Sequence, residues 1–465
     1  MALRIGVLAD DFTGATDIAG FLVSAGMTTV QFTSPEDLPA HLDERVDAAV
    51  ISLKTRSIAP EEAVAQSLKA LSALTSHGAE QIIFKYCSTF DSTAEGNIGP
   101  VTDALLDAMG EDFTVLAPAL PVNGRTVYQG HLFVHDQPLD ESGMRDHPVT
   151  PMTDSSLVRL MQAQAQGRAV VVPYATVEAG PEAVREALTE ARSSGVRYAV
   201  PDTVEMRHLE TLGAALTRMP LVTGGSGIGY GLARALTQAR VEAEHDSSEA
   251  RSAAAEWRFS PGPAVVLSGS SSQMTNAQVI AYREHAAAAA LEISAVLADP
   301  AGYCAEVLAW VQEHQRPEEL APLVYATASA DQVRAAQQKH GAQELSAAIE
   351  DFFSRLARAL REQGTRRFIV AGGETSGAVT QGLGVRGFEV GPQIAPGVPW
   401  TRTLPDLLPE TTGAETLDLA LKSGNFGAED FFSAAQQLVA HHSSAQRSET
   451  QRPETQHLTR EGGRA

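Results

Sequence analysis

The sequence predicts an α/β protein with two α/β domains, mainly parallel sheets and a catalytic cleft between the domains. Three observations lead to this prediction. Short apolar runs alternate with longer amphipathic stretches, which is the pattern of strands and helices in parallel sheets. A polar, charged stretch at residues 238–260 interrupts the alternation, and a second alternating series follows it. Acid-rich and glycine-rich turns come directly after several apolar runs, where α/β proteins bind ligands.

Seven apolar runs in the first half are predicted strands, and helical stretches separate most of them. They cover residues 3–8, 48–52, 81–85, 114–117, 169–173, 198–201 and 221–223. After the first run, the apolar residues recur at the spacing of one helix face; they are Ala15, Ile18, Ala19, Leu22 and Val23. The chain is therefore expected to begin with a strand that leads into a helix.

Four apolar runs in the second half are also predicted strands, at residues 264–267, 291–295, 323–326 and 368–370. Residues 441–465 contain almost nothing apolar and are expected to form a disordered tail. The predicted organisation is a first domain at 1–240, an interdomain connection at 241–261, a second domain at 262–440, and the tail. A chain of 465 residues is long enough for two or three domains.

The formal net charge of −22 argues against nucleic acid or an anionic membrane as a partner. A small anionic substrate is compatible with this charge if the site itself is basic. The chain has no run of 18 apolar residues and no leader-like start, so a cytoplasmic location is expected. Cys87 and Cys304 provide neither a disulfide framework nor a metal-ligand spacing, and both are expected to be small buried residues.

The stretch ADDFTGATD at residues 9–17 places acids and hydroxyls at the carboxyl end of the first predicted strand. Asp10, Asp11 and Thr13 therefore lie where open α/β sheets hold their ligands. Acids gathered at this point suggest a polyhydroxy ligand rather than a phosphate. The alternative is that Asp10 or Asp11 only caps the following helix.

Two further motifs follow predicted strands and carry cations. KYCSTFDSTAEGNIGP at 85–100 combines Lys85 with hydroxyls and an acid, which suits a carboxylate or phosphate oxygen, although Asp91 or Ser92 could simply cap a helix. PALPVNGRTVYQGHLFV at 118–134 contains an Asn-Gly turn that would present Arg125 for bidentate binding of a carboxylate, although a single arginine is often only solvated. His147, in the irregular loop that follows, is more typical of a structural role.

Glycine-rich turns at 222–231, 268–275 and 371–379 each follow an apolar strand and precede a helix, a geometry that binds anions through backbone N–H groups. None is a P-loop, none matches the G-x-S-x-G of serine hydrolases, and the first lacks the third glycine of a dinucleotide fingerprint. The turn KSGNFG at 422–427 also precedes a helix. It either adds to a nucleotide site in the second half or is a structural turn.

The combination of ADDFTGATD, KYCSTFDST, PALPVNGRT, SGSSSQ, GGETSG and KSGNFG resembles the four-carbon acid sugar kinase family, over residues 4–438. The stretches KYCSTFDSTAEGNIGPV, NGRTVYQGHLFV and ESGMRDHPVTPM resemble its 3-oxo-tetronate kinase branch most closely. Threonate and erythronate kinases usually carry Arg-Gly in the loop after Asp-Ser-Thr, where this chain has Ala94 and Glu95.

The resemblance implies an acid-sugar domain at 1–240 and an ATP-binding domain at 262–440. It implies a Mg²⁺- and ATP-dependent kinase that converts 3-oxo-tetronate (3-dehydro-erythronate or 3-dehydro-threonate) to the 4-phosphate in sugar-acid catabolism. The nucleotide contacts carried over by motif are Ser268, Gly372, Gly373, Glu374, Thr375 and Gly424. Glu374 would orient the metal through water, and the sequence does not identify the metal ligands.

The expected substrate-binding residues are Asp10, Asp11, Thr13, Lys85, Ser92, Thr93 and Arg125. Lys85 and Arg125 would bind the carboxylate of the acid, and Asp10 and Asp11 would accept hydrogen bonds from its hydroxyls. The expected catalytic residues are Asp11, as first choice for accepting the proton of the 4-hydroxyl, and Asp91 as second choice. Closure of the two domains would exclude water from the reaction.

Three other functions stay open on the sequence alone. A D-threonate or D-erythronate 4-kinase of the same family would share all these motifs. An NAD-dependent oxidoreductase would need an acidic ribose-binding residue, and a non-catalytic acid-sugar binding protein would leave the glycine-rich turns unexplained. The family also implies a pathway link to a decarboxylating aldolase-type enzyme, and a homodimer is expected without support from particular residues.

Overall fold

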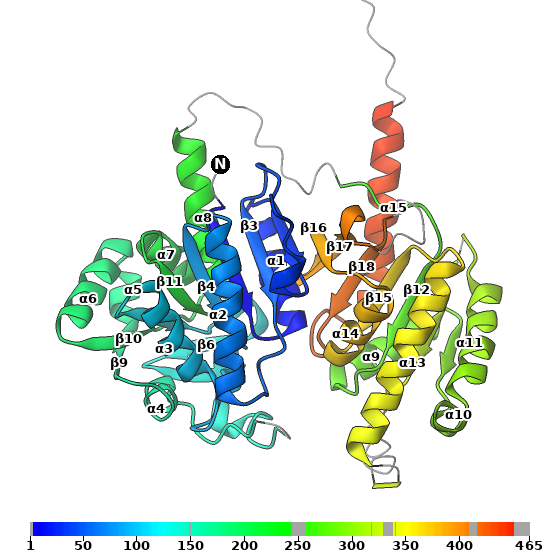
Figure 1. The fold of residues 1–465 in the computed structure, drawn as a ribbon, viewed down its shortest axis with the longest axis horizontal. Helices are drawn as coiled ribbons and strands as arrows, with labels where there is room; N and C mark the ends of the chain where they lie inside the picture. The colour runs from blue at the N-terminus through cyan, green and yellow to red at the C-terminus, as the bar shows by residue number, and fades with distance from the viewer. Residues whose placement is uncertain are drawn as a thin grey trace, which may run out of the picture.

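A single sheet of 15 strands runs through the whole molecule, and helices cover both of its faces (Figure 1). The structure is a computed structural model that describes residues 3–147, 150–243, 257–317, 319–328, 338–339, 341–408 and 416–450. We call residues 3–243 the N-terminal half and residues 257–450 the C-terminal half. The predicted α/β class with mainly parallel strands is confirmed.

The N-terminal half contributes eight parallel strands to the sheet. In spatial order they are β2 (Thr29–Phe32), β3 (Ala48–Ser52), β1 (Ile5–Ala9), β4 (Gln81–Lys85), β11 (Leu221–Gly224), β5 (Thr114–Ala117), β10 (Val196–Pro201) and β9 (Arg168–Val172). The central strands are buried on both faces, which is why they read as continuous apolar runs rather than as alternating patterns.

Helices from the N-terminal half pack against both faces of this part of the sheet. One face is covered by α2 (Pro60–Ser76), α3 (Ile98–Met109) and α4 (Leu157–Gln162). The other is covered by α1 (Phe12–Ser24), α5 (Tyr174–Glu178), α6 (Pro181–Ser193), α7 (Met206–Leu216) and α8 (Ser226–Ala243). Because α1 follows β1 directly, the first residues of α1 lie at the carboxyl edge of the sheet.

The C-terminal half continues the same sheet with seven strands. From the outer edge inward these are β13 (Ala288–Ala290), β14 (Leu323–Tyr325), β12 (Ala264–Ser268), β15 (Arg367–Ala371), β18 (Asp418–Lys422), β17 (Val398–Thr403) and β16 (Gly387–Ala395). The first five are mutually parallel, whereas β17 and β16 are antiparallel to their neighbours. Strand β16 pairs antiparallel with β2, and this pairing joins the two halves.

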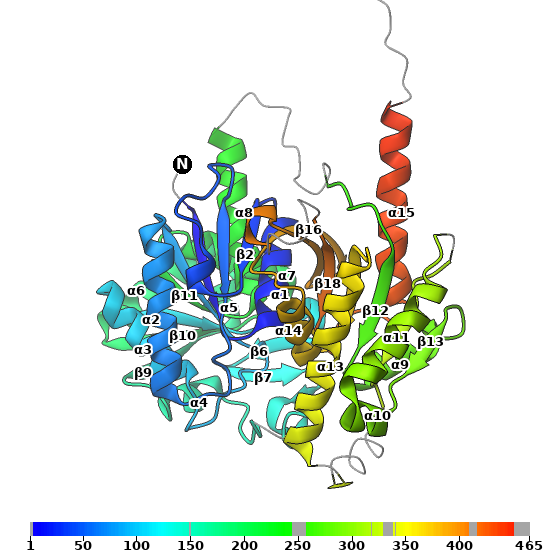
Figure 2. The ribbon, with the colours of Figure 1, turned by 45° about the vertical axis from the view of Figure 1, so that its right-hand side comes forward.

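Helices again cover both faces of the C-terminal part. One face carries α10 (Ile293–Ala298), α11 (Pro300–His314), α13 (Ala342–Glu362) and α14 (Gly373–Gly382), and the other carries α9 (Gln273–Tyr282) and α15 (Phe431–Thr450). A separate antiparallel sheet consists of β6 (Arg125–Tyr128), β7 (His131–Val134) and β8 (Gln137–Pro138), and β6 and β7 lie below the large sheet in Figure 2.

Ten of the eleven predicted strands are present, and the one at 291–295 is wrong. The chain there enters α10 at Ile293, because Ile293 and Val296 have the three-residue spacing of a helix and Val296 is buried. The extended edge strand β13 is formed just before it by three alanines. The strands β2, β6, β7, β8, β13, β16, β17 and β18 were not predicted.

The described elements also bear on the predicted termini and connection. Helix α15 continues to Thr450, ten residues into the segment predicted to be a disordered tail, and residues 451–465 lie outside the described residues. Most of the predicted interdomain connection, residues 244–256, lies outside them too. Within the described part of the chain, no helix combines the length and the apolar character needed to cross a membrane.

Candidate functional site

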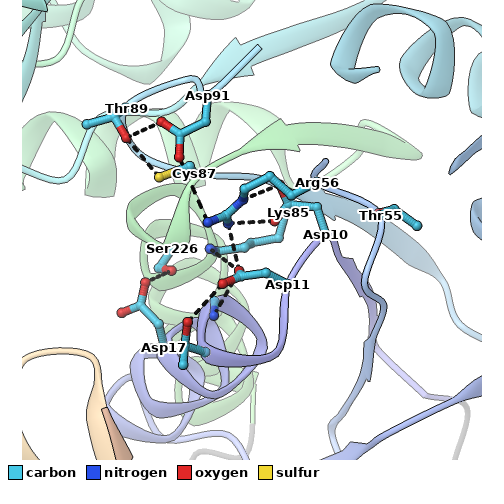
Figure 3. Close-up of polar contacts among 12 residues, drawn as sticks. Asp10, Asp11, Asp17, Thr55, Arg56, Lys85, Cys87, Thr89, Asp91 and Ser226 are labelled. Carbon is cyan, nitrogen blue, oxygen red and sulfur yellow. Dashed lines mark hydrogen bonds and ion pairs between the residues drawn. The ribbon is translucent and has the colours of Figure 1, made fainter. Parts of the chain in front are cut away.

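Charged side chains meet at the carboxyl ends of the adjacent strands β3, β1 and β4 (Figure 3). The Arg56 guanidinium donates to both carboxylate oxygens of Asp10, at 2.9 Å from Nε and 2.8 Å from Nη2. The same Nη2 donates to Asp11 Oδ1 at 2.7 Å. Lys85 Nζ lies 4.0 Å from this Asp11 oxygen. We call Asp10, Asp11, Arg56 and Lys85 the charged cluster.

Asp11 is both a helix cap and a member of the charged cluster. Its carboxylate accepts hydrogen bonds from Gly14 N at 3.0 Å and from Thr13 Oγ1 at 2.8 Å, which caps α1. A Cβ built on Gly14 would lie 2.2 Å from both Asp11 Oδ1 and Lys85 Nζ. Only glycine therefore lets the first turn of α1 approach these two charges.

The two neighbouring aspartates have pKa values that are displaced in opposite directions. Burial raises the pKa of Asp10 in spite of its pairing with Arg56. Burial acts in the same direction on Asp11, but the charges of Arg56 and Lys85 and the bonds from Thr13 and Gly14 hold its pKa below the ordinary value. Asp11 is therefore ionised at neutral pH and can accept a proton.

The loop after β4 brings Asp91 to the edge of the charged cluster. Asp91 Oδ2 lies 3.9 Å from Arg56 Nη1, and Asp91 Oδ1 accepts a hydrogen bond from Thr89 Oγ1 at 2.6 Å. Cys87 contacts the same Thr89 hydroxyl at 2.8 Å. Burial and the charge of Asp91 raise the pKa of the Cys87 thiol to about 12, so this cysteine is not a nucleophile at neutral pH.

Two of the predicted substrate-binding residues contact other parts of the chain. Ser92 is buried and donates to Gln164 Oε1 at 2.7 Å, and its hydroxyl also accepts from Ile98 N at the start of α3 at 3.4 Å. The Thr93 hydroxyl accepts from Glu95 N at 3.4 Å. Among the described contacts, neither hydroxyl reaches the charged cluster. Both residues shape the loop that carries Asp91.

The sequence reasoning missed Arg56. The signal was present, because the segment SLKTRS follows the predicted strand 48–52 with two cations, in the position that ADDFTG holds after the first strand. Parallel pairing of β1 with β3 brings these two segments together, and Thr55 N and Arg56 N both donate to Asp10 O, at 2.9 and 3.1 Å. A comparison of the segments at the carboxyl ends of all the predicted strands would have found this arginine.

In the C-terminal half, three turns come together after the adjacent strands β12, β15 and β18. A Cβ built on Gly372 would lie 3.2 Å from Ser270 N, and one built on Gly424 would lie 2.4 Å from Ser270 Oγ. Ser268 is buried, and its hydroxyl contacts Thr327 Oγ1 at 2.6 Å. The predicted nucleotide turns 268–272, 372–375 and 422–424 therefore form one surface, which we call the three-turn surface.

Two helices begin at the three-turn surface. Ser272 caps α9 by accepting from Thr275 N at 3.1 Å, and α14 begins at Gly373 after Gly372, whose φ is +120°. Thr375 is buried, whereas Glu374 is exposed in the first turn of α14. Free N–H groups and aligned peptide dipoles at two helix N-termini make this surface suited to an anion.

The turn at 222–231 has a packing role. Cβ atoms built on Gly224, Gly225 and Gly227 would lie 2.2, 2.6 and 2.4 Å from the carbonyl oxygens of residues 117, 118 and 119. These glycines allow the start of α8 to pack directly on the backbone that follows β5. Their spacing follows from this close approach, and so the resemblance to a dinucleotide fingerprint has a structural cause.

The two half-sites face each other across the seam between the halves. A Cβ built on Gly373, the first residue of α14, would lie 3.8 Å from the side chain of Thr13 in the first turn of α1. Both halves also line a cavity of about 1030 Å³. Its polar lining includes Asn123, Arg125 and His135 from the N-terminal half and Gln273, Asn425 and Asp430 from the C-terminal half.

Arg125 connects the cavity to the charged cluster. It begins β6, donates to the carbonyl of Asn123, and its charge lowers the pKa of Asp17, on which Lys85 also acts. The charges of Arg125 and Lys85 thus act on the same buried carboxyl, Asp17. Within the described residues, no group of three His, Cys, Asp or Glu side chains could hold a metal ion by itself.

Asp17 is a buried carboxyl between the two halves. Its Oδ2 accepts a hydrogen bond from the Ser226 hydroxyl, and its Oδ1, which has no hydrogen-bond partner among the described residues, faces Gly397 of the β16–β17 turn. Burial raises the pKa of Asp17 to about 6, even though Lys85, Ser226 and Arg125 act in the opposite direction. In the folded protein this group is therefore protonated at mildly acidic pH, unlike an ordinary aspartate.

We expect Asp17→Asn to stabilise the ligand-free protein at pH 7 by up to about 3 kcal/mol, because a carboxyl with a raised pKa weakens folding above that pKa. The folded state holds a proton that the unfolded state releases between pH 4 and 6, so wild-type stability falls as pH rises through this window. Urea unfolding at pH 4 and pH 7 measures the effect, with exposed Asp136→Asn as control. The stability of the variant is compared with that of the wild type at each pH. If this difference is less favourable to the variant at pH 7 than at pH 4, the raised pKa of Asp17 is wrong.

Comparisons with known proteins agree with this two-part site. The family models "Sugar-binding N-terminal domain" and "Nucleotide-binding C-terminal domain" match residues 5–232 and 265–432. Similar proteins named 3-oxo-tetronate kinase come from Brucella melitensis (53% identity, 94% of this chain, 96% of the relative) and Salmonella typhimurium (55%, 93% and 99%). Solved structures from Salmonella typhimurium (53% identity, TM-score 0.83, 94% and 99% covered) and Haemophilus influenzae (48%, 0.74, 93% and 100%) are similar over nearly their whole length.

Proposed function

Because the chain belongs to the four-carbon acid sugar kinase family, in its 3-oxo-tetronate kinase branch, we propose that it phosphorylates the 4-hydroxyl of 3-oxo-tetronate with ATP. The products are 3-oxo-tetronate 4-phosphate and ADP. The oxygen of the 4-hydroxyl forms a bond to the γ-phosphorus, the bond from that phosphorus to the bridging oxygen of ADP breaks, and the hydroxyl proton leaves to a base.

The observation that carries this proposal is the contact between the first turns of α1 and α14. Thr13, next to the charged cluster, and Gly373, on the three-turn surface, come from opposite halves and face each other directly. An acid bound beside Asp11 and a nucleotide bound at α14 would have their reacting groups at this contact. Phosphoryl transfer depends mainly on such positioning and on stabilisation of charge.

In the N-terminal half, the proposed acid-sugar domain at 1–240, we assign the acid to the space between the charged cluster and Arg125. Lys85 is almost buried and makes no hydrogen bond with the described residues, so its ammonium protons are available to the substrate carboxylate. Arg125 is the second carboxylate donor. Asp11 accepts the proton of the 4-hydroxyl, since it is ionised and partly exposed, and Asp91 is the second candidate.

In the C-terminal half, the proposed ATP domain at 262–440, the phosphates lie on the three-turn surface. N–H groups at the start of α14 bind their oxygens. Mg²⁺ fits this place together with the nucleotide, because it is usually held by one or two carboxylates plus phosphate oxygens, and Glu374 is exposed there without an ion pair to the described residues. Held in this way, a bound metal would supply positive charge that neutralises the phosphates.

The test is ADP release from Mg-ATP with a panel of acids: both 3-oxo-tetronate enantiomers, D-threonate, L-threonate and D-erythronate. Turnover restricted to the 3-oxo acids supports the proposal and identifies the preferred enantiomer. Turnover on threonate or erythronate alone keeps the kinase and rejects the substrate. No turnover on any acid, with binding of NAD, rejects the kinase.

We expect Gly372→Ala to weaken nucleotide binding by roughly 10-fold, because an alanine at a φ of +120° costs about 1–3 kcal/mol of strain. Its Cβ would also press on Thr375 Oγ1 at 3.0 Å and Ser270 N at 3.2 Å. The matched control is Gly373→Ala, whose Cβ meets nothing closer than 3.8 Å. The KM for ATP measures the effect, and equal values for both variants would contradict it.

The place of the enzyme in metabolism follows from its product. A 3-oxo acid loses carbon dioxide readily, so a decarboxylating aldolase-type enzyme is the proposed next step.

The need for ATP fits a cytoplasmic reaction, and a homodimer is the proposed assembly. Size-exclusion chromatography with light scattering tests the last of these directly.

A further inference from the structure

Lys422 is a buried cation at the centre of the three-turn surface. It ends β18, and its side chain is fully buried. Its ammonium donates to Thr275 Oγ1 at 3.0 Å and to the carbonyl oxygen of Gly424 at 3.1 Å. Its Nζ also lies 5.8 Å from the centroid of the Phe431 ring. No carboxylate of the described residues lies within ion-pair distance of it.

The contacts of Lys422 reach two of the three turns and the first turn of α9. Its side chain bonds α9 at Thr275 and the turn of β18 at Gly424, and its carbonyl oxygen accepts from Gly372 N at 2.9 Å. The Gly424 carbonyl also accepts from Ser272 Oγ at 2.6 Å and Thr275 Oγ1 at 2.7 Å. These hydrogen bonds hold the turn 422–424 against α9.

A buried ammonium without a counter-ion is costly, because it loses its hydration and gains no opposite charge. Here burial lowers the pKa of Lys422 to about 7, and no charged side chain of the elements packed around it contributes to the shift. The N-termini of α9 and α14 add positive partial charge to the same surface. The buried ammonium and the two helix N-termini therefore favour an anion at this surface.

We propose that Lys422 is a positioning residue of the nucleotide site, whose ammonium holds the turn 422–424 against α9 at the anion-binding surface and whose missing counter-charge is the polyphosphate of the nucleotide. This inference rests on the proposed function, since the anion is taken to be a nucleotide. It goes beyond the motif-derived contacts, which do not include Lys422. Nucleotide binding should then be coupled to protonation of this lysine.

Isothermal titration of Mg-ADP into the full-length protein at pH 8, in two buffers with different ionisation enthalpies, measures this coupling. The lysine is largely neutral in the free protein at this pH and becomes charged beside the phosphates, while ADP itself is already fully ionised. We expect uptake of more than half a proton per ADP bound. Each unit by which binding raises the lysine pKa makes ADP affinity about tenfold higher at low pH than at high pH.

Two variants complete the experiment. Lys422→Met keeps the apolar volume without the charge and should bind ADP at least tenfold more weakly with no proton uptake. Lys422→Arg stays charged and should retain binding, also without uptake. A merely structural lysine would weaken binding when replaced but would give no uptake in the wild type, so absence of uptake there overturns the inference even if a variant does not fold.

The two proposals fail separately. Proton uptake with ADP in a protein that phosphorylates none of the acids would reject the substrate and leave the role of Lys422 intact. A wild-type protein that phosphorylates 3-oxo-tetronate but binds ADP without proton uptake would support the substrate and reject the role of Lys422. Unchanged ADP affinity in Lys422→Met also overturns the inference.

Discussion

Replacing Arg56 with alanine is expected to lower kcat/KM for 3-oxo-tetronate by roughly 10³-fold, because about 3–4 kcal/mol of charge stabilisation and positioning is lost. Arg56 is the cation that holds Asp10 and Asp11 side by side, with three hydrogen bonds of 2.7–2.9 Å. Without it, two neighbouring carboxylates repel each other, and Asp11 no longer points at the substrate hydroxyl.

The same variant should lose about 3 kcal/mol of folding stability, because breaking a buried ion pair leaves an uncompensated charge. Asp10 is the charge in question, since its side chain is 4% exposed. Arg56→Lys is the matched control. It keeps the positive charge but cannot bond both Asp10 oxygens and Asp11 at once, so it should recover stability while kcat/KM stays reduced.

Steady-state kinetics and urea unfolding of both variants distinguish the two effects. If Arg56→Ala kept wild-type kcat/KM, the charged cluster would lie outside the site. If Arg56→Lys had full activity, charge alone would be sufficient and the bidentate geometry would have no role. The KM for ATP should not change in either variant, because Arg56 belongs to the opposite half-site.

Asp11→Asn is expected to lower kcat by 10²- to 10⁴-fold, which is the usual contribution of a positioned acid–base group. Asparagine keeps the shape of the side chain, and its oxygen can still accept the bond from Gly14 N that caps α1. It removes the charge that would accept the proton of the 4-hydroxyl. Stability should therefore change little compared with the loss of rate.

Asp91→Asn tests the second candidate in the same assay. Asp91 is 3.9 Å from Arg56 and accepts from Thr89, so we expect a smaller loss of rate than for Asp11→Asn. A larger loss for Asp91→Asn would exchange the roles of the two acids. ADP affinity measured by titration is the control for both, since neither residue belongs to the three-turn surface.

The sequence predicted the parts of the site that are local. Asp10, Asp11 and Thr13 occupy one turn after one strand, so their proximity follows from chain connectivity. Lys85 lies beside Asp11 because β4 neighbours β1 and parallel strands end at the same edge. Ser92 and Thr93 share a motif with Lys85, but the loop turns their hydroxyls toward Gln164 and Glu95, a direction that no spacing rule specifies.

The strands likewise divide into those that local sequence predicts and those that depend on pairing in the folded sheet. Apolar runs that are buried on both faces predicted β1, β3, β4 and β5 at or near their observed bounds. The strand at 291–295 was wrong because a short apolar run fits an edge strand and a buried helix equally well. The antiparallel strands β16 and β17, which join the halves, lack such runs and take their place through pairing with β2 and β18.

The sequence by itself determined the α/β class, the two-part organisation and the chemistry of each turn, because these depend on residue type and short-range spacing. Only the tertiary structure decided that Arg56 bridges the two acids, that Thr13 faces Gly373, and that Lys422 is buried without a counter-ion among the described residues. These features depend on contacts between residues far apart in the chain, whose proximity is set by strand order and packing. Strand order is a property of the folded sheet, and local sequence patterns do not encode it.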